Sequence, residues 1–130
     1  MYVLPQDESL IKANVFHKDC PARYLLNIVS DKWSLLIIDL LGDDSMRNGE
    51  LIRSIEGISQ KMLTQTLRKL ADLKIVERHD LKTIPPHVEY KLTSVGLSLR
   101  DKVCALDRWV EQNMMEILPA DKVDFIDNEI

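Results

Sequence analysis

The sequence predicts an α+β domain that is mainly helical and carries one small antiparallel sheet. Residues 59 to 72 have the spacing of an amphipathic helix, and residues 74 to 92, which follow directly, have the pattern of a two-stranded hairpin. The chain has 130 residues, of which 45% are hydrophobic and 29% charged, an ordinary balance for one domain with a single core.

The first half of the chain is predicted to be helical scaffold. Pro21 suits the first turn of a helix, because its missing N–H is not needed there. The apolar face of that helix consists of Leu25, Leu26, Ile28 and Val29. Residues 33 to 41 are apolar almost all round, which predicts a buried central helix that ends at Gly42. A short helix is expected at about residues 48 to 55, and its inward side chains are Leu51, Ile52 and Ile55.

The next helix is expected from Ser59 to about Asp72. Ser59 follows the turn residue Gly57, and its hydroxyl can accept from the free amides of the first turn. The buried face consists of Leu63, Leu67 and Leu70, at positions i, i+4 and i+7. At about 100° per residue, the polar face consists of Gln60, Lys61, Thr64, Gln65 and Arg68. Side chains of these types contact phosphates or base edges in a major groove, although an isolated helix with this face would more often be plain solvated surface.

A hairpin directly after this helix changes that interpretation. Val88, Tyr90 and Leu92 alternate with polar residues, which predicts a half-buried strand. Pro85 and Pro86 cannot donate to a sheet, so they mark the turn before it. A helix followed by a hairpin with a basic, proline-stiffened tip is typical of a winged helix-turn-helix, which binds double-stranded DNA. Contacts to the DNA backbone or minor groove are also expected from Arg47, Arg53, Lys82 and His87.

A long helix is predicted from the cap residue Thr93 to about Leu118, before Pro119. Its apolar positions have the spacing of a helix–helix seam, and they are Leu99, Val103, Leu106 and Val110. The seam could pack only on its own domain, or it could pair with a second subunit. In the second case it would act with an N-terminal helix that includes Leu10, Ile11 and Val15.

The expected organisation is a single domain: an N-terminal arm at 1–19, a core at 20–92, a dimerisation helix at 93–118 and an acidic tail at 119–130. The formal net charge of −4 argues at first against a polyanionic partner. However, residues 47 to 91 hold nine Lys and Arg against six Asp and Glu, a net of +3. The positive charge is therefore concentrated where the helix and the hairpin are predicted, as a nucleic-acid footprint requires.

The motifs from about residue 20 to residue 110 resemble those of the HxlR family of bacterial winged-helix transcription regulators. The matching elements are Cys20-Pro21, Asp31-Lys32-Trp33, Arg47, Glu50-Leu51, the run GISQKMLT at 57–64, Val76-Glu77-Arg78, Pro85-Pro86, Val88-Glu89-Tyr90, Leu92-Thr93, Gly96 and Trp109. The resemblance implies a homodimer joined through its terminal helices. It also implies sequence-specific regulation, with repression as the expected sense, at an inverted-repeat operator.

Three positions depart from the family pattern. Asn48 stands where an aromatic residue is usual, and Asn48-Gly49 is a turn dipeptide, which argues against a short strand before this helix. Lys74 stands where a glycine is usual, so a positive φ there would carry strain. His87 stands where an arginine is common, which removes a permanent charge from the wing.

Only two cysteines occur, Cys20 and Cys104, which argues against a disulfide scaffold. Cys20 precedes Pro21 at a helix start, where the helix dipole favours a thiolate, and an exposed thiol of this kind suits a sensor of electrophiles or oxidants. The resemblance implies the same role, because several family members respond through a cysteine at this position. The alternative for Cys20 is simple packing, which is also the expectation for Cys104.

Other classes are disfavoured. No apolar run approaches the length of a membrane span and no signal peptide opens the chain, so a cytoplasmic protein is expected. No phosphate-binding glycine loop or oriented Cys-His pair suggests an enzyme or a cofactor. His17 with Cys20, or His79 facing His87 across the hairpin, would give a metal two ligands where four are usual, so no metal site is predicted. The remaining alternative is a winged-helix module that binds protein instead of DNA.

Overall fold

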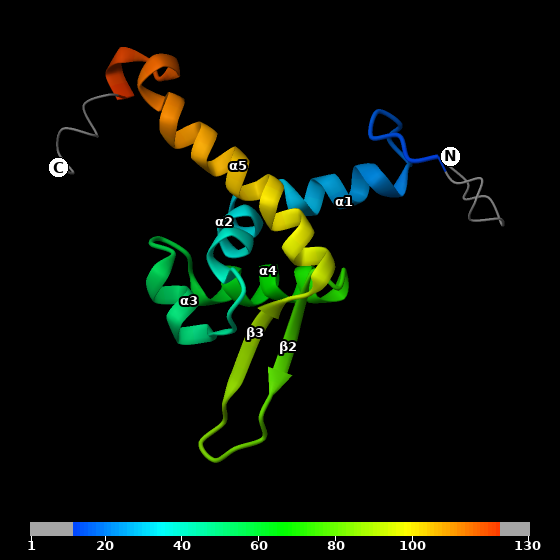
Figure 1. Ribbon diagram of the computed structural model, residues 1–130, viewed down its shortest axis with the longest axis vertical. Helices are drawn as coiled ribbons and strands as arrows, with labels where there is room; N and C mark the ends of the chain where they lie inside the picture. The colour runs from blue at the N-terminus through cyan, green and yellow to red at the C-terminus, as the bar shows by residue number, and fades with distance from the viewer. Residues whose placement is uncertain (1–11, 123–130) are drawn as a thin grey trace.

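The computed structural model describes residues 12–122. Its elements in chain order are α1 (Pro21–Val29), α2 (Lys32–Leu41), β1 (Met46–Arg47), α3 (Asn48–Ser54), α4 (Gln60–Asp72), β2 (Val76–Asp80), β3 (Val88–Leu92) and α5 (Ser94–Ile117). The β2–β3 hairpin projects from one side of the helical body, and the second half of α5 extends away on the other side (Figure 1). The predicted α+β, mainly helical winged helix-turn-helix is thus confirmed.

The core lies around α2. The Asp31 side chain accepts from the backbone N–H groups of Trp33 and Ser34 and so caps this helix, which ends at Gly42 with a φ of 49°. The residues buried against one another are Ile37, Ile38, Leu41, Leu51, Ile55, Ile58, Leu63, Leu67, Leu70, Ile75, Val76, Leu92 and Val103. They come from α2 to α5 and from both long strands, so one continuous core holds the helix-turn-helix and the hairpin together.

The sheet contains a third strand that the sequence argued against. β1 pairs with β3 in an antiparallel arrangement, with Met46 opposite Tyr90 and Arg47 opposite Glu89, and the strand order is β1-β3-β2. The Glu50 side chain accepts from the Arg47 backbone N–H at 3.1 Å, so Asn48 and Gly49 form the first turn of α3 rather than a break before it. The prediction of a looser entry without a leading strand is therefore wrong.

The turn after α4 sets the direction of β2. The Lys74 N–H donates to the Ala71 carbonyl and the Ile75 N–H to the Leu70 carbonyl, both at 3.0 Å, which is a Schellman motif. Lys74 has a φ of 60°, in the left-handed region that favours glycine, so the motif is completed here by a residue with a side chain. Ile75 and Leu70 are both buried, so the motif brings the start of β2 onto the core.

The two halves of α5 have different surroundings. The Thr93 hydroxyl accepts from the Gly96 N–H and caps the helix as predicted. Val103 is buried against α2 and Leu99 is half-buried, whereas Leu106 and Val110 are 48% and 47% exposed. The first two residues of the predicted seam, Leu99 and Val103, therefore pack on the chain's own core, and the last two, Leu106 and Val110, lie on the exposed surface. Within residues 12–122, no helix combines the length and the apolar character needed to cross a bilayer.

Candidate nucleic-acid interface

The polar face of α4 has the predicted arrangement. The Ser59 hydroxyl accepts from the Met62 N–H at 3.0 Å and starts the helix. The leucines at 63, 67 and 70 are at most 2% exposed, and they anchor α4 on the core. Lys61, Gln65 and Arg68 lie on the opposite side and are exposed. Three flexible polar side chains of this kind on a rigidly held helix can reach phosphates and base edges.

Gln60, a predicted DNA contact, forms a paired amide interaction within the fold. Its side chain accepts from the Asn48 amide at 2.8 Å and donates to the Asn48 amide oxygen at 3.0 Å. It also donates to the Thr64 hydroxyl at 3.0 Å. Asn48 is the first residue of α3 and Gln60 the first of α4, so this pair joins the two helices of the helix-turn-helix at their starts.

A groove between α4 and the hairpin contains an arginine that the sequence analysis did not select. The groove has a volume of about 320 Å³, and its lining residues are Thr64, Leu67, Arg68, Ala71, Asp72, Arg78 and Tyr90. Arg78 is exposed and lies directly opposite Tyr90 in the β2–β3 pair. Arg78 lies two residues after Val76 in the same strand, so its side chain points to the same face of the hairpin as that apolar residue. This spacing could have indicated that Arg78 turns toward α4.

The wing tip is exposed and its two predicted contacts differ. Lys82 has a φ of 53°, and its N–H donates to the Asp80 carboxylate at 2.8 Å, so its side chain stands on an ordered turn. The His87 ring lies 2.9 Å from the Glu89 carboxylate, which also accepts from the Ser45 hydroxyl at 3.0 Å. These hydrogen bonds, together with the charges of His87 and Arg47, lower the pKa of Glu89. The His87 side chain is therefore engaged by Glu89 of β3, the strand that it precedes.

The other predicted contacts lie at the edges of the helix-turn-helix. Arg47 stands opposite Glu89 in the sheet, and Arg53 lies in the last turn of α3; both are exposed. His79 pairs with Glu77 at 2.9 Å and does not face His87 across the hairpin. Within the described part of the chain, no group of three or more His, Cys, Asp or Glu is placed to hold a metal.

Cys20 is buried, which corrects the expectation of an exposed thiol. It is the N-cap residue of α1 and is 3% exposed. The Asn14 backbone N–H donates to its sulfur at 3.3 Å. Arg23 holds the preceding loop over this position, with its Nε donating to the Val15 carbonyl at 2.6 Å and its Nη2 to the Phe16 carbonyl at 3.1 Å. An electrophile can therefore reach the thiol only when this loop moves.

Exposed apolar side chains gather on two helices, α1 and the second half of α5. On α1, Tyr24, Leu25 and Leu26 are exposed, and none of the residues of this helix is buried. On the second half of α5, the exposed apolar residues are Leu106, Trp109, Val110, Met115 and Ile117. Val15 was predicted to lie in an N-terminal helix, but it lies in a turn and is 40% exposed, which corrects that prediction at this position. Leu10 and Ile11 lie outside the described residues.

Charged groups connect α5 to α2. Arg108 donates to the Asp39 carboxylate at 2.8 Å, Arg100 donates to the Asp39 carbonyl at 2.9 Å, and Cys104 donates to the Asp39 carboxylate at 3.3 Å. Burial opposes the charge of Asp39, but hydrogen bonds from Asp107 and Cys104 and the two arginines outweigh it and lower its pKa. Burial and the hydrogen bond to Asp39 raise the pKa of Asp107 to about 6. Burial and the same carboxylate raise the pKa of the Cys104 thiol, so this cysteine is a packed hydrogen-bond donor.

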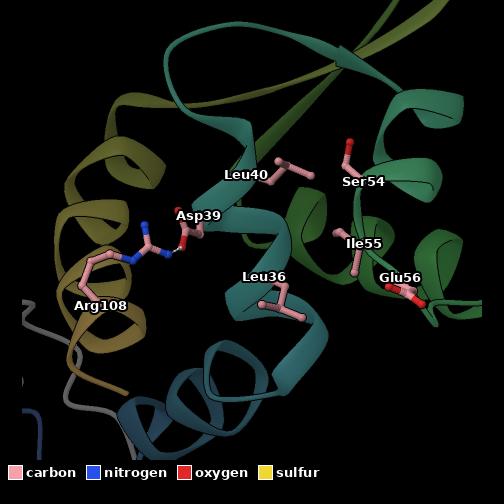
Figure 2. Close-up of a pocket in the computed structure, with 7 residues that line it drawn as sticks. All are labelled: Leu36, Asp39, Leu40, Ser54, Ile55, Glu56 and Arg108. Atoms are coloured by element: carbon pink, nitrogen blue, oxygen red, sulfur yellow. Dashed lines mark hydrogen bonds and ion pairs between the residues drawn. The ribbon is translucent and has the colours of Figure 1, made fainter. Parts of the chain in front are cut away.

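A cavity of about 330 Å³ adjoins this cluster (Figure 2). It is lined by Leu36, Asp39 and Leu40 of α2, by Ser54, Ile55 and Glu56 at the end of α3, and by Arg108 of α5. Arg108 already holds the Asp39 carboxylate. The other polar side chains that line the cavity are Ser54 and Glu56, at the end of α3.

The arrangement defines a class of protein: a capped helix with an exposed polar face, packed beside a projecting hairpin, is a winged helix-turn-helix domain. Residues 28–118 match the family model of the HxlR-like helix-turn-helix. The chain belongs to this family.

Relatives agree with that assignment. The chain is 39% identical over 111 residues to the HTH-type transcriptional regulator YtfH of Escherichia coli, covering 85% of this chain and 88% of that one. The structure of a protein named as transcriptional regulator ytfH from Salmonella typhimurium has a TM-score of 0.78 and 39% identity, covering 82% of this chain and 96% of that one. The structure of the redox regulator HypR in its oxidized form has a TM-score of 0.67 and 35% identity, covering 72% of this chain and 97% of that one.

Proposed function

We propose that this chain is a transcription regulator that binds double-stranded DNA through α4 and the hairpin. The observation that carries the proposal is the exposed polar face of α4, where Lys61, Gln65 and Arg68 stand on a helix anchored by buried leucines. The excess of positive charge on residues 47 to 91 supports it, because phosphate contacts dominate affinity for DNA. The names of the relatives, HTH-type transcriptional regulators, point the same way.

We also propose that it acts as a homodimer and as a repressor. The exposed apolar residues of α1 and of the second half of α5 support dimerisation, because monomers rarely expose large contiguous apolar surface. A two-fold dimer places two copies of α4 about 34 to 36 Å apart along the DNA, so the operator is an inverted repeat. Gln65 and Arg68 are then the candidates for contacts to base edges, and Lys82, Arg47 and Arg53 contact the backbone or the minor groove.

Cys20 is the proposed sensor of an electrophile such as a quinone, or of an aldehyde or an oxidant. The likeness to a redox regulator supports this proposal. With a quinone, the thiol sulfur adds to a ring carbon and the thiol proton ends on the quinone oxygen, giving an adduct without a leaving group. The buried position has no room for the adduct, so the loop at 12–19 and the start of α1 must move. Movement of α1, which carries exposed apolar residues of the proposed dimer surface, changes the spacing of the two α4 helices.

The test is a gel-shift titration with DNA from upstream of the protein's own gene and its neighbours. A retarded band that survives competitor DNA is expected, with an affinity that falls steeply as salt rises. Lys61→Ala should weaken the band, whereas Lys102→Ala on α5 is the matched control and should not. Binding that is absent, or indifferent to salt and to Lys61→Ala, would favour the protein-interaction module.

The sensor is tested in the same assay. A quinone should change the retarded band of the wild type, and Cys20→Ser should abolish this response while keeping the basal affinity. Cys104→Ser is the matched control, since its thiol donates to Asp39 inside the fold, and it should keep the response. A response that survives Cys20→Ser would refute the role of this thiol.

A further inference from the structure

The groove between α4 and the hairpin brings two arginines from different elements to one place. Arg68 comes from the middle of α4 and Arg78 from the middle of β2, and both line the same volume of about 320 Å³. The walls are Leu67 and Ala71 on the helix side and Tyr90 on the sheet side.

The strand register explains how Arg78 reaches this position. Val76 is 2% exposed and lies opposite Leu92, so this face of the hairpin is turned toward the core at its base. Two residues further on, Arg78 has the same direction and lies opposite Tyr90, but the core has ended and the side chain is exposed. It therefore meets the flank of α4.

The charges of the groove are not neutralised within the described structure. Arg100 and Arg108 are both held by Asp39, yet neither Arg68 nor Arg78 makes an ion pair with any of residues 12–122. Asp72 also lines the groove and opposes an anion, which leaves a net charge of +1 from two arginines and one carboxylate. Two guanidinium groups that line one groove and make no ion pair within the described residues are suited to bind the oxygens of a single phosphate group.

Winged-helix docking places a DNA strand at this position. When α4 lies in a major groove and the hairpin over the neighbouring minor groove, the sugar-phosphate strand that separates the two grooves must cross between helix and hairpin. We propose that Arg68 and Arg78 together bind one phosphodiester of this strand, a step that rests on the proposed DNA binding. Arg68 is then a backbone contact rather than a base reader, and the two arginines set the register of α4 in the major groove.

The test is a salt titration of DNA affinity for wild type, Arg78→Ala and Arg68→Ala, on the operator and on unrelated DNA. Each substitution should weaken binding to both DNAs by the same factor and should reduce the slope of log K against log salt. Because the two arginines share one phosphate, the double substitution should reduce that slope by about 1 in total rather than by about 2. If the phosphate contact contributes nothing to affinity at 1 M salt, its loss corresponds to about an eightfold lower affinity at 0.1 M salt. Asp72→Asn should strengthen binding to both DNAs.

Lys91→Ala is the matched control, since Lys91 lies on the opposite face of the same hairpin, facing Glu77, and should change little. Arg78→Lys, which keeps the charge and the aliphatic stem beside Tyr90, should keep the slope, and melting curves of all variants monitor folding. A normal slope in Arg78→Ala, or a loss limited to one base position, would overturn the inference. Absence of DNA binding by the wild type would instead remove the proposed function itself.

Discussion

Replacing Gly96 with alanine tests how α5 is seated on the sheet. Gly96 is the third residue of α5, and its N–H is bound by the Thr93 hydroxyl at 3.0 Å. An added Cβ would lie well inside 3.0 Å of the Ile75 carbonyl oxygen and 3.1 Å from Leu92 Cδ2. The Ile75 carbonyl cannot easily give way, because it also accepts from the Thr93 backbone N–H at 3.0 Å.

Two opposing effects decide the sign of the change. In an exposed helix, glycine to alanine stabilises by about 1 kcal/mol. Here the clash requires the start of α5 to move away from the backbone that leads into β2, and overpacking of this severity costs about 3 kcal/mol. We therefore expect Gly96→Ala to lower the free energy of unfolding by about 2 kcal/mol, with a fall in Tm of about 8 °C.

The assay is urea unfolding followed by circular dichroism, at one protein concentration for all variants, because association would add to apparent stability. Gly49→Ala is the matched control. It is also in a helix, but its added Cβ would meet only the flexible end of the Arg53 side chain, at 3.1 Å. The control should be neutral or slightly stabilised. A Gly96→Ala variant as stable as the wild type would refute the reasoning.

Two further predictions concern α5. The pKa of Asp107, about 6 in the fold against an ordinary 3.8, means that its ionisation costs stability as pH rises through this interval. Asp107→Asn should therefore raise the free energy of unfolding by about 1 to 2 kcal/mol at pH 8, after allowance for solvent screening, and should leave it unchanged at pH 4. Urea titrations at the two pH values measure this difference, and equal gains in stability at both would contradict the prediction. Val110→Lys should shift the protein to monomers in analytical ultracentrifugation and weaken operator binding, whereas Ile84→Lys at the fully exposed hairpin tip should leave the assembly unchanged. A Val110→Lys protein that still dimerises would place the interface elsewhere.

Several elements were predictable because their causes are local. The capping residues Ser59 and Thr93 lie at the helix starts where they were expected, and α5 ends before Pro119. Lys74, the position singled out for a positive φ, has a φ of 60°. Each of these features depends on backbone groups within a few residues of the side chain, so spacing along the chain is sufficient evidence.

The features that the sequence did not reveal are contacts between distant segments. β1 has two residues and exists because β3 pairs with it, which no pattern within Met46–Arg47 could reveal. Gln60 has the same residue type as Gln65, but Asn48 lies within hydrogen-bond distance of the first and so occupies its amide. For Cys20 the sequence left open an exposed sensor thiol or a packed residue, and it is the preceding loop, folded over the thiol, that makes it buried.

The sequence by itself determined the winged helix-turn-helix, the family and the polar face of α4, because periodicity, capping residues and turn residues specify local structure and the direction of an apolar face. Only the tertiary structure decided which polar side chains remain unengaged, that Arg78 joins Arg68 in one groove, and where the apolar seam of α5 leaves the core. These features depend on strand register and on the packing of segments far apart in the chain, and burial or pairing there is set by the neighbour rather than by the residue itself.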